Sequence, residues 1–232
     1  MLSENGFFRL MAWTSPAFPI GSYVYSHGLE FAVEDGTVNS AAALRGWIET
    51  VLTRGGGRAD AIHFCAAWRA VDAGDQEGFL EVARHAQAMR ASSEMALESG
   101  AQGAAFLEAV AASWPVDGLD GWRGLLDGAE PPIKPAQSIA VALAAALADI
   151  PLREALFAYL QALAANLVSA GVRLVPLGQT QGQKVIAGLF ECLEETVDEA
   201  LAAEAAEWGN AAPLVDLMSM KHETQYTRLF RS

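Results

Sequence analysis

Apolar side chains recur along most of the chain at intervals of three and four residues, the period of an α-helix. The strongest example predicts a helix that begins after Asn39 or Ser40 and stops at the glycines 55–57. Its apolar stripe consists of Leu44, Trp47, Ile48, Val51 and Leu52. Alternation typical of β-strands is scarce, and alanine, the best helix former, is abundant. We therefore expect an all-α protein, a single-domain helical bundle of roughly eight to ten helices with no sheet.

The same period predicts further helices, separated by turn residues. They span 59–73, 75–90, 92–114, 135–149, 151–170 and 181–207. Pro151 suits a first helical position, where its missing N–H costs nothing, and Gly171 suits a helix stop. The least regular stretch, 115–135, has four glycines and four prolines and predicts a connection with one short helical turn. Nothing in it indicates a domain boundary, so residues 1–232 are expected to form one domain.

Composition narrows the class of protein. The 52% of hydrophobic residues can fill a substantial core, and a net charge of −13 argues against nucleic-acid binding. Cys65 and Cys192 lie far apart in helical patterns, which fits neither a disulfide framework nor a zinc site. The first residues lack a basic leader, and the longest apolar run, 139–148, is half of the ~20 residues that span a bilayer. We expect a cytoplasmic protein without a membrane segment.

The last twenty residues, 213–232, do not resemble a frayed terminus. They carry much apolar area, and they are locally basic on an acidic molecule through Lys221, Arg228 and Arg231. The apolar members are Leu214, Val215, Leu217, Met218, Met220, Tyr226, Leu229 and Phe230. This segment, called the tail below, must therefore pack on its own protein or on a partner.

Acidic residues are segregated just before the tail. No Lys or Arg occurs between Lys184 and Lys221, while acids accumulate on one face of the predicted helix 181–207. A solvated helix face is the simpler interpretation, and a docking face for a basic partner is the alternative.

Three motifs approach known catalytic or ligand-binding patterns without completing them. His222 and Glu223 begin an HExxH pattern, but Tyr226 stands where the second zinc-binding histidine belongs, so a metal hydrolase is the least favoured function. The segment 178–184 reads GQTQGQK, whose glycine spacing differs from a phosphate-binding loop. The four histidines are scattered, and His85 one turn after Glu81 suggests a surface pair.

Two loop-like segments carry more polar groups than a connection needs. Residues 15–30 read SPAFPIGSYVYSHGLE, in which Ser22 is predicted to cap a helix that presents four polar side chains, namely Tyr23, Ser26, His27 and Glu30. This segment is either a tight helix corner or a contact surface. The loop at 172–184 is likewise either a turn with Thr180 as helix cap or a contact surface that presents Gln179, Gln183 and Lys184.

Three blocks together resemble the urease accessory protein UreF family. They are residues 15–30, VRLVPLGQTQGQK at 172–184, and PLVDLMSMKHETQYTRLFRS at 213–232. The resemblance implies an all-α, usually dimeric protein without catalytic activity or cofactor of its own. It implies a scaffold that joins UreD (UreH in some organisms) and the GTPase UreG to deliver nickel into apo-urease.

The resemblance also implies roles for individual residues. The tail residues His222, Glu223, Tyr226, Arg228 and Arg231 are expected at the UreD contact. Tyr23, Arg173 and Lys184 are expected in assembly or in signalling to the GTPase. The alternative is a regulator of GTP hydrolysis, in which Lys184 or Arg173 stabilises developing phosphoryl charge.

Overall fold

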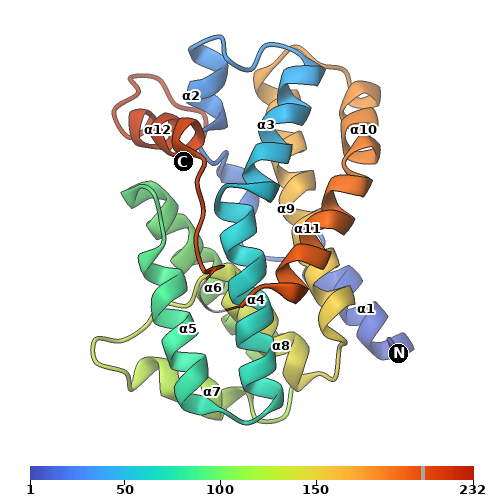
Figure 1. Ribbon diagram of the computed structural model, residues 1–232, viewed down its shortest axis with the longest axis vertical. Coiled ribbons are helices and arrows are strands. Elements are labelled where there is room, and N and C mark those ends of the chain that lie inside the picture. Colours follow the sequence, from blue (N-terminus) through green and yellow to red (C-terminus); the bar gives the residue numbers. More distant parts are fainter. Residues whose placement is uncertain (205–206) are drawn as a thin grey trace.

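The computed structural model describes residues 1–204 and 207–232 and is built from α-helices (Figure 1). The first half contains α1 (Glu4–Trp13), a short 3-10 helix η1 (Ser22–Val24), α2 (Leu29–Glu34), α3 (Ala41–Thr53), α4 (Gly56–Asp72), α5 (Gln76–Ala88) and α6 (Ser93–Ser113). The second half contains α7 (Leu119–Asp127), α8 (Gln137–Leu147), α9 (Leu152–Leu174), α10 (Gln179–Gly188), α11 (Phe190–Ala202) and α12 (Pro213–His222). The all-α prediction is confirmed, since no strand occurs in these two ranges.

Helix α4 runs through the middle of the bundle and packs against α3, α5, α8, α9 and α11 (Figure 1). Helix α8 is buried continuously from Ser138 to Ala146, mostly through alanines with Ile139, Val141 and Leu143 between them. A helix that is apolar on all sides belongs in a core, and small side chains let neighbouring helices approach closely. The alanine-rich helix α8 is therefore a central packing surface for α4, α6 and α9.

A buried charge network links four parts of this core. Asp60 on α4 receives hydrogen bonds from Arg90 at 2.7 Å, from Ser138 on α8 at 2.9 Å and from Tyr159 on α9 at 3.1 Å. Burial alone would raise the pKa of Asp60, but Arg90 and Ser138 bind the ionised carboxylate and hold its pKa below the usual value. Because every member has a partner, the network fixes how these helices are aligned.

Local capping signals explain three of the predicted helix starts. Ser40, Asp75 and Ser92 each accept a hydrogen bond from the backbone N–H three residues later, which begins α3, α5 and α6. Pro151 lies one position before α9 begins, at its N-cap. The predicted stop at Gly171 is wrong, because α9 continues to Leu174. A Cβ at Gly171 would lie 2.4 Å from Leu44 of α3, so this glycine permits close helix packing.

Other sequence expectations need correction. The predicted helix 181–207 consists of two helices, α10 and α11, which meet at the buried Leu189; its end at 205–206 lies outside the described residues. The break lets α10 follow α3 and α9 while α11 turns onto α4. The stretch 115–135 contains a full helix, α7, because Leu119 and Leu126 are buried. Helix α10 is capped by Gly178 and Gln181 and not by Thr180.

Helix α9 is long and apolar enough, by length and composition, to cross a membrane. Half of its most apolar window is buried inside this protein, and the helix packs on α2, α3, α4, α8, α10 and α11. The core helix of a soluble protein passes the same test. Its surroundings here are those of a core helix.

Candidate functional site

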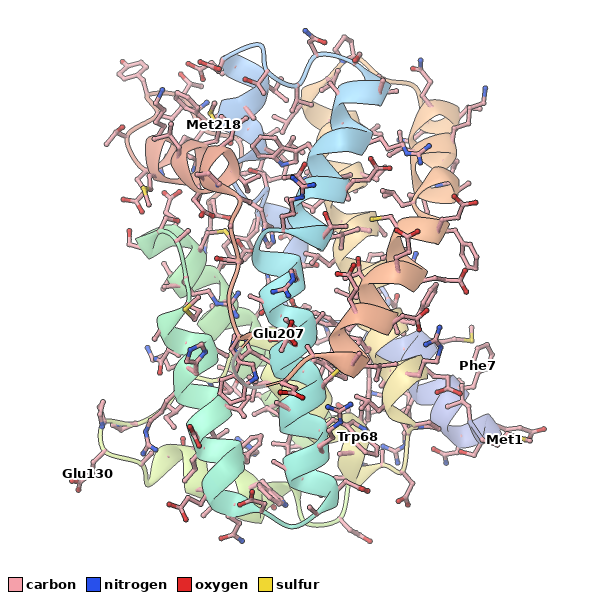
Figure 2. All side chains as sticks on the ribbon, in the orientation of Figure 1. Met1, Phe7, Trp68, Glu130, Glu207 and Met218 are labelled. Atoms are coloured by element: carbon pink, nitrogen blue, oxygen red, sulfur yellow. The ribbon has the colours of Figure 1, made fainter. Side chains whose placement is uncertain are left out.

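The tail folds back on its own protein, where α12 crosses α2 and lies against α6 (Figure 1). Pro213 starts α12, as its missing N–H allows, and the inward face buries Val215, Met218, Ser219 and His222. Met218 is labelled on this helix in Figure 2. The tail is therefore an integral part of the fold.

Close contact between α12 and α2 depends on a glycine. Gly28, the N-cap of α2, has φ +74°, and a Cβ there would lie 2.7 Å from the backbone nitrogen of Ser219. Ser219 in turn shares a hydrogen bond of 2.6 Å with Ser92, the N-cap of α6. The helix predicted to begin at Ser22 does not form, since η1 ends at Val24 and α2 begins only at Leu29. That expectation was wrong because residues 25–28 form an irregular segment on which the tail packs.

His222 is the centre of the contact. Its side chain is fully buried, with Nδ1 2.6 Å from Glu94 and Nε2 3.1 Å from Glu30. Both ring nitrogens therefore have a carboxylate partner. His222 lies between α2 and α6 and links these two helices to the tail.

Glu30 also binds the extended end of the tail. Its two oxygens accept the backbone N–H groups of Leu229 at 2.6 Å and Phe230 at 2.9 Å. Arg228 binds the other oxygen of Glu94 at 2.5 Å. One buried carboxylate thus satisfies two backbone donors and a histidine, which is the compensation that a buried charge requires.

The end of the tail is held by the segment before α2. Arg231 N–H donates to the oxygen of Val24, and Ser26 N–H donates to the backbone oxygen of Ser232, both at 2.8 Å. The Ser232 hydroxyl donates to Glu98 at 2.6 Å. We call Glu30, Glu94 and Glu98 the carboxylate anchor, since each binds the tail.

His27, in the segment before α2, binds Glu98 of this anchor. Its Nε2 lies 2.8 Å from Glu98, and its φ of +55° is unusual for a residue with a side chain. Burial opposes the charged ring, but the adjacent Glu98 outweighs that effect and raises the pKa of His27 above 6.5. Gln102, one turn along α6, donates to the same carboxylate at 3.0 Å.

The outer side of the tail is exposed and carries several large apolar side chains. Tyr226 is completely exposed and Leu229 is 65% exposed, and the exposed side of α12 carries Leu214, Leu217 and Met220. Arg231 is exposed beside them. Glu223, also exposed, accepts the N–H and hydroxyl of Ser93, which lowers its pKa.

The structure brings together the first and last sequence blocks and Arg173 of the second. Ser26 and Glu30 hydrogen-bond the tail, His27 is linked to it through Glu98, and the Arg173 guanidinium lies 4.4 Å from the Phe230 ring centre. Arg173 also donates to the backbone oxygen of Tyr23 at 2.9 Å. The exposed Gln179, Gln183 and Lys184 lie on α10, at the opposite side of α3 (Figure 1). The contact groups therefore form two separate surfaces.

Sequence reasoning missed the α6 residues that complete the anchor. Glu94, Glu98 and Gln102 share one face of α6, and two of them are almost fully buried, which their i, i+4 spacing alone does not reveal. It also treated His85 as half of a surface pair, whereas His85 Nδ1 lies 2.8 Å from His63 Nε2, with Trp208 packed on both rings. In the described residues, no group of three or more His, Cys, Asp or Glu is arranged to hold a metal.

Comparison with known proteins gives a consistent result. The family model UreF matches residues 38–190. A protein of Granulibacter bethesdensis, named urease accessory protein UreF, is 47% identical over 229 residues, covering 99% of this chain and 95% of its own. Proteins of the same name from Rhodopseudomonas palustris (47% over 225 residues, 97% and 93% covered) and a Bradyrhizobium species (46% over 225 residues, 97% and 91% covered) are similar to it as well.

Proposed function

Because the chain belongs to the UreF family of urease accessory proteins, whose name supports a role in urease maturation, we propose that it is a non-enzymatic scaffold. In this proposal it joins UreD (or UreH) and the GTPase UreG to apo-urease in the cytoplasm. Nickel is the cargo of the assembled complex, and the chain has no resident cofactor.

The observation that carries the proposal is the contrast between the two sides of the tail. Its inner side is fixed by the carboxylate anchor, while Tyr226 and Leu229 stay in water at 102% and 65% exposure. Apolar side chains held rigidly at a surface lose little entropy on binding, so they suit a protein interface. We assign this outer side to UreD.

The burial or exposure of each tail residue indicates whether it positions the tail or contacts the partner. His222, with 0% exposure, is a positioning residue that keeps the tail in shape, together with Ser26, His27 and Glu30 on the body. Tyr226, Leu229 and Arg231 make the contact itself. Glu223 and Arg228 lie at its edge, where each already binds the first turn of α6.

Surface substitutions test this assignment better than deletion of the tail, which would also remove buried Met218 and Phe230. The variant Tyr226→Ala with Arg231→Glu should weaken binding of UreD about 30-fold or more, the effect of losing an interface hot spot. Lys134→Glu, the same charge change in the exposed loop before α8, is the matched control. Equal affinity of the double variant and the control, measured by calorimetry, would overturn the assignment.

A second candidate function follows from the exposure of Lys184 on α10. A regulator of GTP hydrolysis needs a cation free to reach the partner's phosphates. Arg173 is engaged by Tyr23 and Phe230, whereas Lys184 makes no ion pair with any described residue. If Lys184 acts in this way, Lys184→Ala should slow GTP turnover by UreG within the complex and Lys134→Ala should not; equal turnover would leave only the scaffold.

We further propose that the homodimer forms through the α1, α9 and α11 face. Phe7, Met11 and Phe190 are 53–58% exposed there, and Phe7 projects from the outer edge (Figure 2). Phe7 and Met11 line a groove with Phe157, and a two-fold axis can bring these apolar residues of two copies together. The variant Phe7→Glu with Phe190→Asp should yield monomers by light scattering, and an unchanged dimer would place the contact elsewhere.

A further inference from the structure

The segment that leads into the tail is fixed to the bundle by contacts of its own. Residues 207–212, called the linker below, run alongside α4 up to the start of α12 (Figure 1). Glu207, the first of them, is labelled beside α4 in Figure 2. Contacts of this kind reduce the mobility that a connecting segment otherwise has.

Arg58, in the first turn of α4, holds the linker by its backbone. Its Nη1 donates to the carbonyl oxygen of Gly209 at 2.6 Å and to that of Glu207 at 3.2 Å. Two residues beyond Gly209, the N–H of Ala211 donates to the carbonyl oxygen of Arg54 at 2.7 Å. These three bonds join the linker to the turn between α3 and α4. A charged donor forms stronger hydrogen bonds than a neutral one, so the two bonds of Arg58 are the stronger part of this attachment.

Two side chains of the linker pack onto the bundle. The ring centre of Trp208 lies 5.1 Å from that of His85 on α5 and 5.7 Å from that of His63 on α4. Ala212 is buried, and a Cβ at Gly55 would lie only 3.3 Å from its Cβ, so this glycine lets the linker approach the turn between α3 and α4. The linker is therefore held near both of its ends, and its second end adjoins the first residue of α12.

Helix α12 is consequently fixed from two directions. The carboxylate anchor holds the residues at and after its end, and the linker holds its start. Between these points the exposed side of α12 carries Leu214, Leu217 and Met220, which are 45–50% exposed. Leu214 lies in the first turn, next to the linker, and Leu217 lies in the second. The direction in which these two side chains point therefore depends on the linker.

We propose that Arg58 is a positioning residue, which acts through the linker to orient the exposed side of α12 for the partner that binds the tail. This role rests on the proposed function, in which that partner is UreD. The partner surface that meets Leu214 and Leu217 is apolar, and Arg58 itself does not contact it. A helix whose start is free to move must be ordered on binding, and each side chain that is immobilised at that moment lowers the affinity. Arg58 removes this cost before the partner arrives.

Hydrogen exchange of the full-length chain tests the positioning without a partner. Arg58→Met keeps the aliphatic stem and removes the donors. Exchange should speed up at the amide of Ala211, which binds the α3–α4 turn, and at the amides of residues 216–218, which form the first hydrogen bonds of α12. The amides of Leu229 and Phe230, which bind the carboxylate anchor, should exchange as before.

A second linker variant and a matched control complete this measurement. Trp208→Leu removes the ring contacts at the other end of the linker and should give the same exchange pattern. Arg84→Met, the same substitution at an exposed site on α5, should leave exchange unchanged. Unaltered exchange at Ala211 and residues 216–218 in both linker variants would refute the proposal. Equal acceleration along the whole tail would refute it too, because it would indicate a general loss of stability.

The affinity for UreD tests the consequence of the positioning. Arg58→Met should weaken binding about tenfold, and Arg84→Met should not. A double-mutant cycle separates positioning from contact. Leu217→Ala should lower the affinity less in Arg58→Met than in the unaltered chain, because a side chain that is not positioned contributes less. The loss from Tyr226→Ala should be the same in both. Full affinity of Arg58→Met, or additive losses for Leu217→Ala, would contradict the proposal.

The outcomes distinguish this role of Arg58 from the proposed function. If Tyr226→Ala with Arg231→Glu binds UreD as tightly as Lys134→Glu does, the proposed function is wrong and the role of Arg58 in binding fails with it. If that double variant is weakened and Arg58→Met is not, the proposed function stands and only the positioning role is refuted.

Discussion

His222 is a polar side chain in the interior of the protein. It is inaccessible to solvent, yet carboxylates face both of its ring nitrogens at 2.6 and 3.1 Å. Burying three ionisable groups is favourable only when each compensates the others. Of the HE pattern at 222–223, His222 is buried against Glu30 and Glu94 while Glu223 is exposed, so the resemblance to a zinc-protease helix has no counterpart in the geometry.

Removing this side chain should be costly. In His222→Ala, Glu30 and Glu94 each lose a buried hydrogen-bond partner and a cavity is left, so we expect the free energy of unfolding to fall by about 3 kcal/mol. Urea denaturation measures this change. Met220→Ala, on the exposed side of the same helix, should change it by less than about 0.5 kcal/mol. Similar losses in the two variants would show that the buried hydrogen bonds contribute little.

The buried His63 side chain is expected to destabilise the folded protein in acid. Burial, together with the neighbouring His85 and Arg90, lowers the pKa of His63 to about 4, from 6.5. The unfolded chain therefore binds this proton first as pH falls, and the folded state loses stability between pH 6.5 and about 4. The loss from this residue amounts to at most about 3 kcal/mol. Denaturation of His63→Gln over this range should show a flatter acid limb, and an identical limb would contradict the prediction.

At the scale of elements, the tail is attached where an irregular segment meets two helices. Residues 25–28 carry His27 and Gly28 at positive φ, and these place Ser26 and Glu30 against the tail. A regular helix from Ser22 would direct these side chains around its axis and could not present them together. The irregular backbone is thus what creates the binding surface for α12.

Gly28→Ala should detach α12 while the bundle stays folded. Two costs combine, the positive φ of about 1–2 kcal/mol and a Cβ that would meet Ser219 N at 2.7 Å. Gly36→Ala tests the cost of positive φ alone, because Gly36 has φ +83° with nothing within 4 Å of its Cβ position. Hydrogen exchange should speed up across 213–232 in Gly28→Ala only. Equal exchange in both variants would mean that the close contact is unimportant.

Helix prediction succeeded where local signals are complete and failed where contacts override them. The Ser40, Asp75 and Ser92 caps sit in the sequence beside the apolar stripes they begin, so α3, α5 and α6 were predictable. The break at Leu189 has no such signal, because Gly188 alone is tolerated inside helices. Both helices pack on α3 and α9, and the additional packing of α11 on α4 decides it.

At the scale of the whole molecule, the tail joins the two ends of the chain. Ser26 binds Ser232, and Glu30 binds Leu229 and Phe230. Closing a flexible loop of about 200 residues costs entropy, so these contacts are favoured by the folded bundle, which already holds the partner groups close together. Attachment of the tail therefore depends on the folded bundle.

His27 makes this attachment depend on pH. The pKa of His27 is raised by Glu98 despite burial, so the folded protein holds the proton more tightly than the unfolded chain does. Its contribution is complete below pH 6.5 and is lost as pH rises through the folded-state pKa. Stability and protection of the tail from proteolysis should fall on the alkaline side. His27→Gln should remove this dependence, and a retained alkaline slope in the variant would assign it to another group.

By itself, the sequence determined the helical class, several helix starts and the three blocks that identify the family, because these depend on periodicity, caps and residues adjacent in the chain. It also showed that the tail is too apolar to remain free in water. Only the tertiary structure decided which tail residues are buried and which are exposed. That division depends on Glu30, Glu94 and Glu98, whose meeting with His222 is set by helix packing and cannot be read from spacing along the chain.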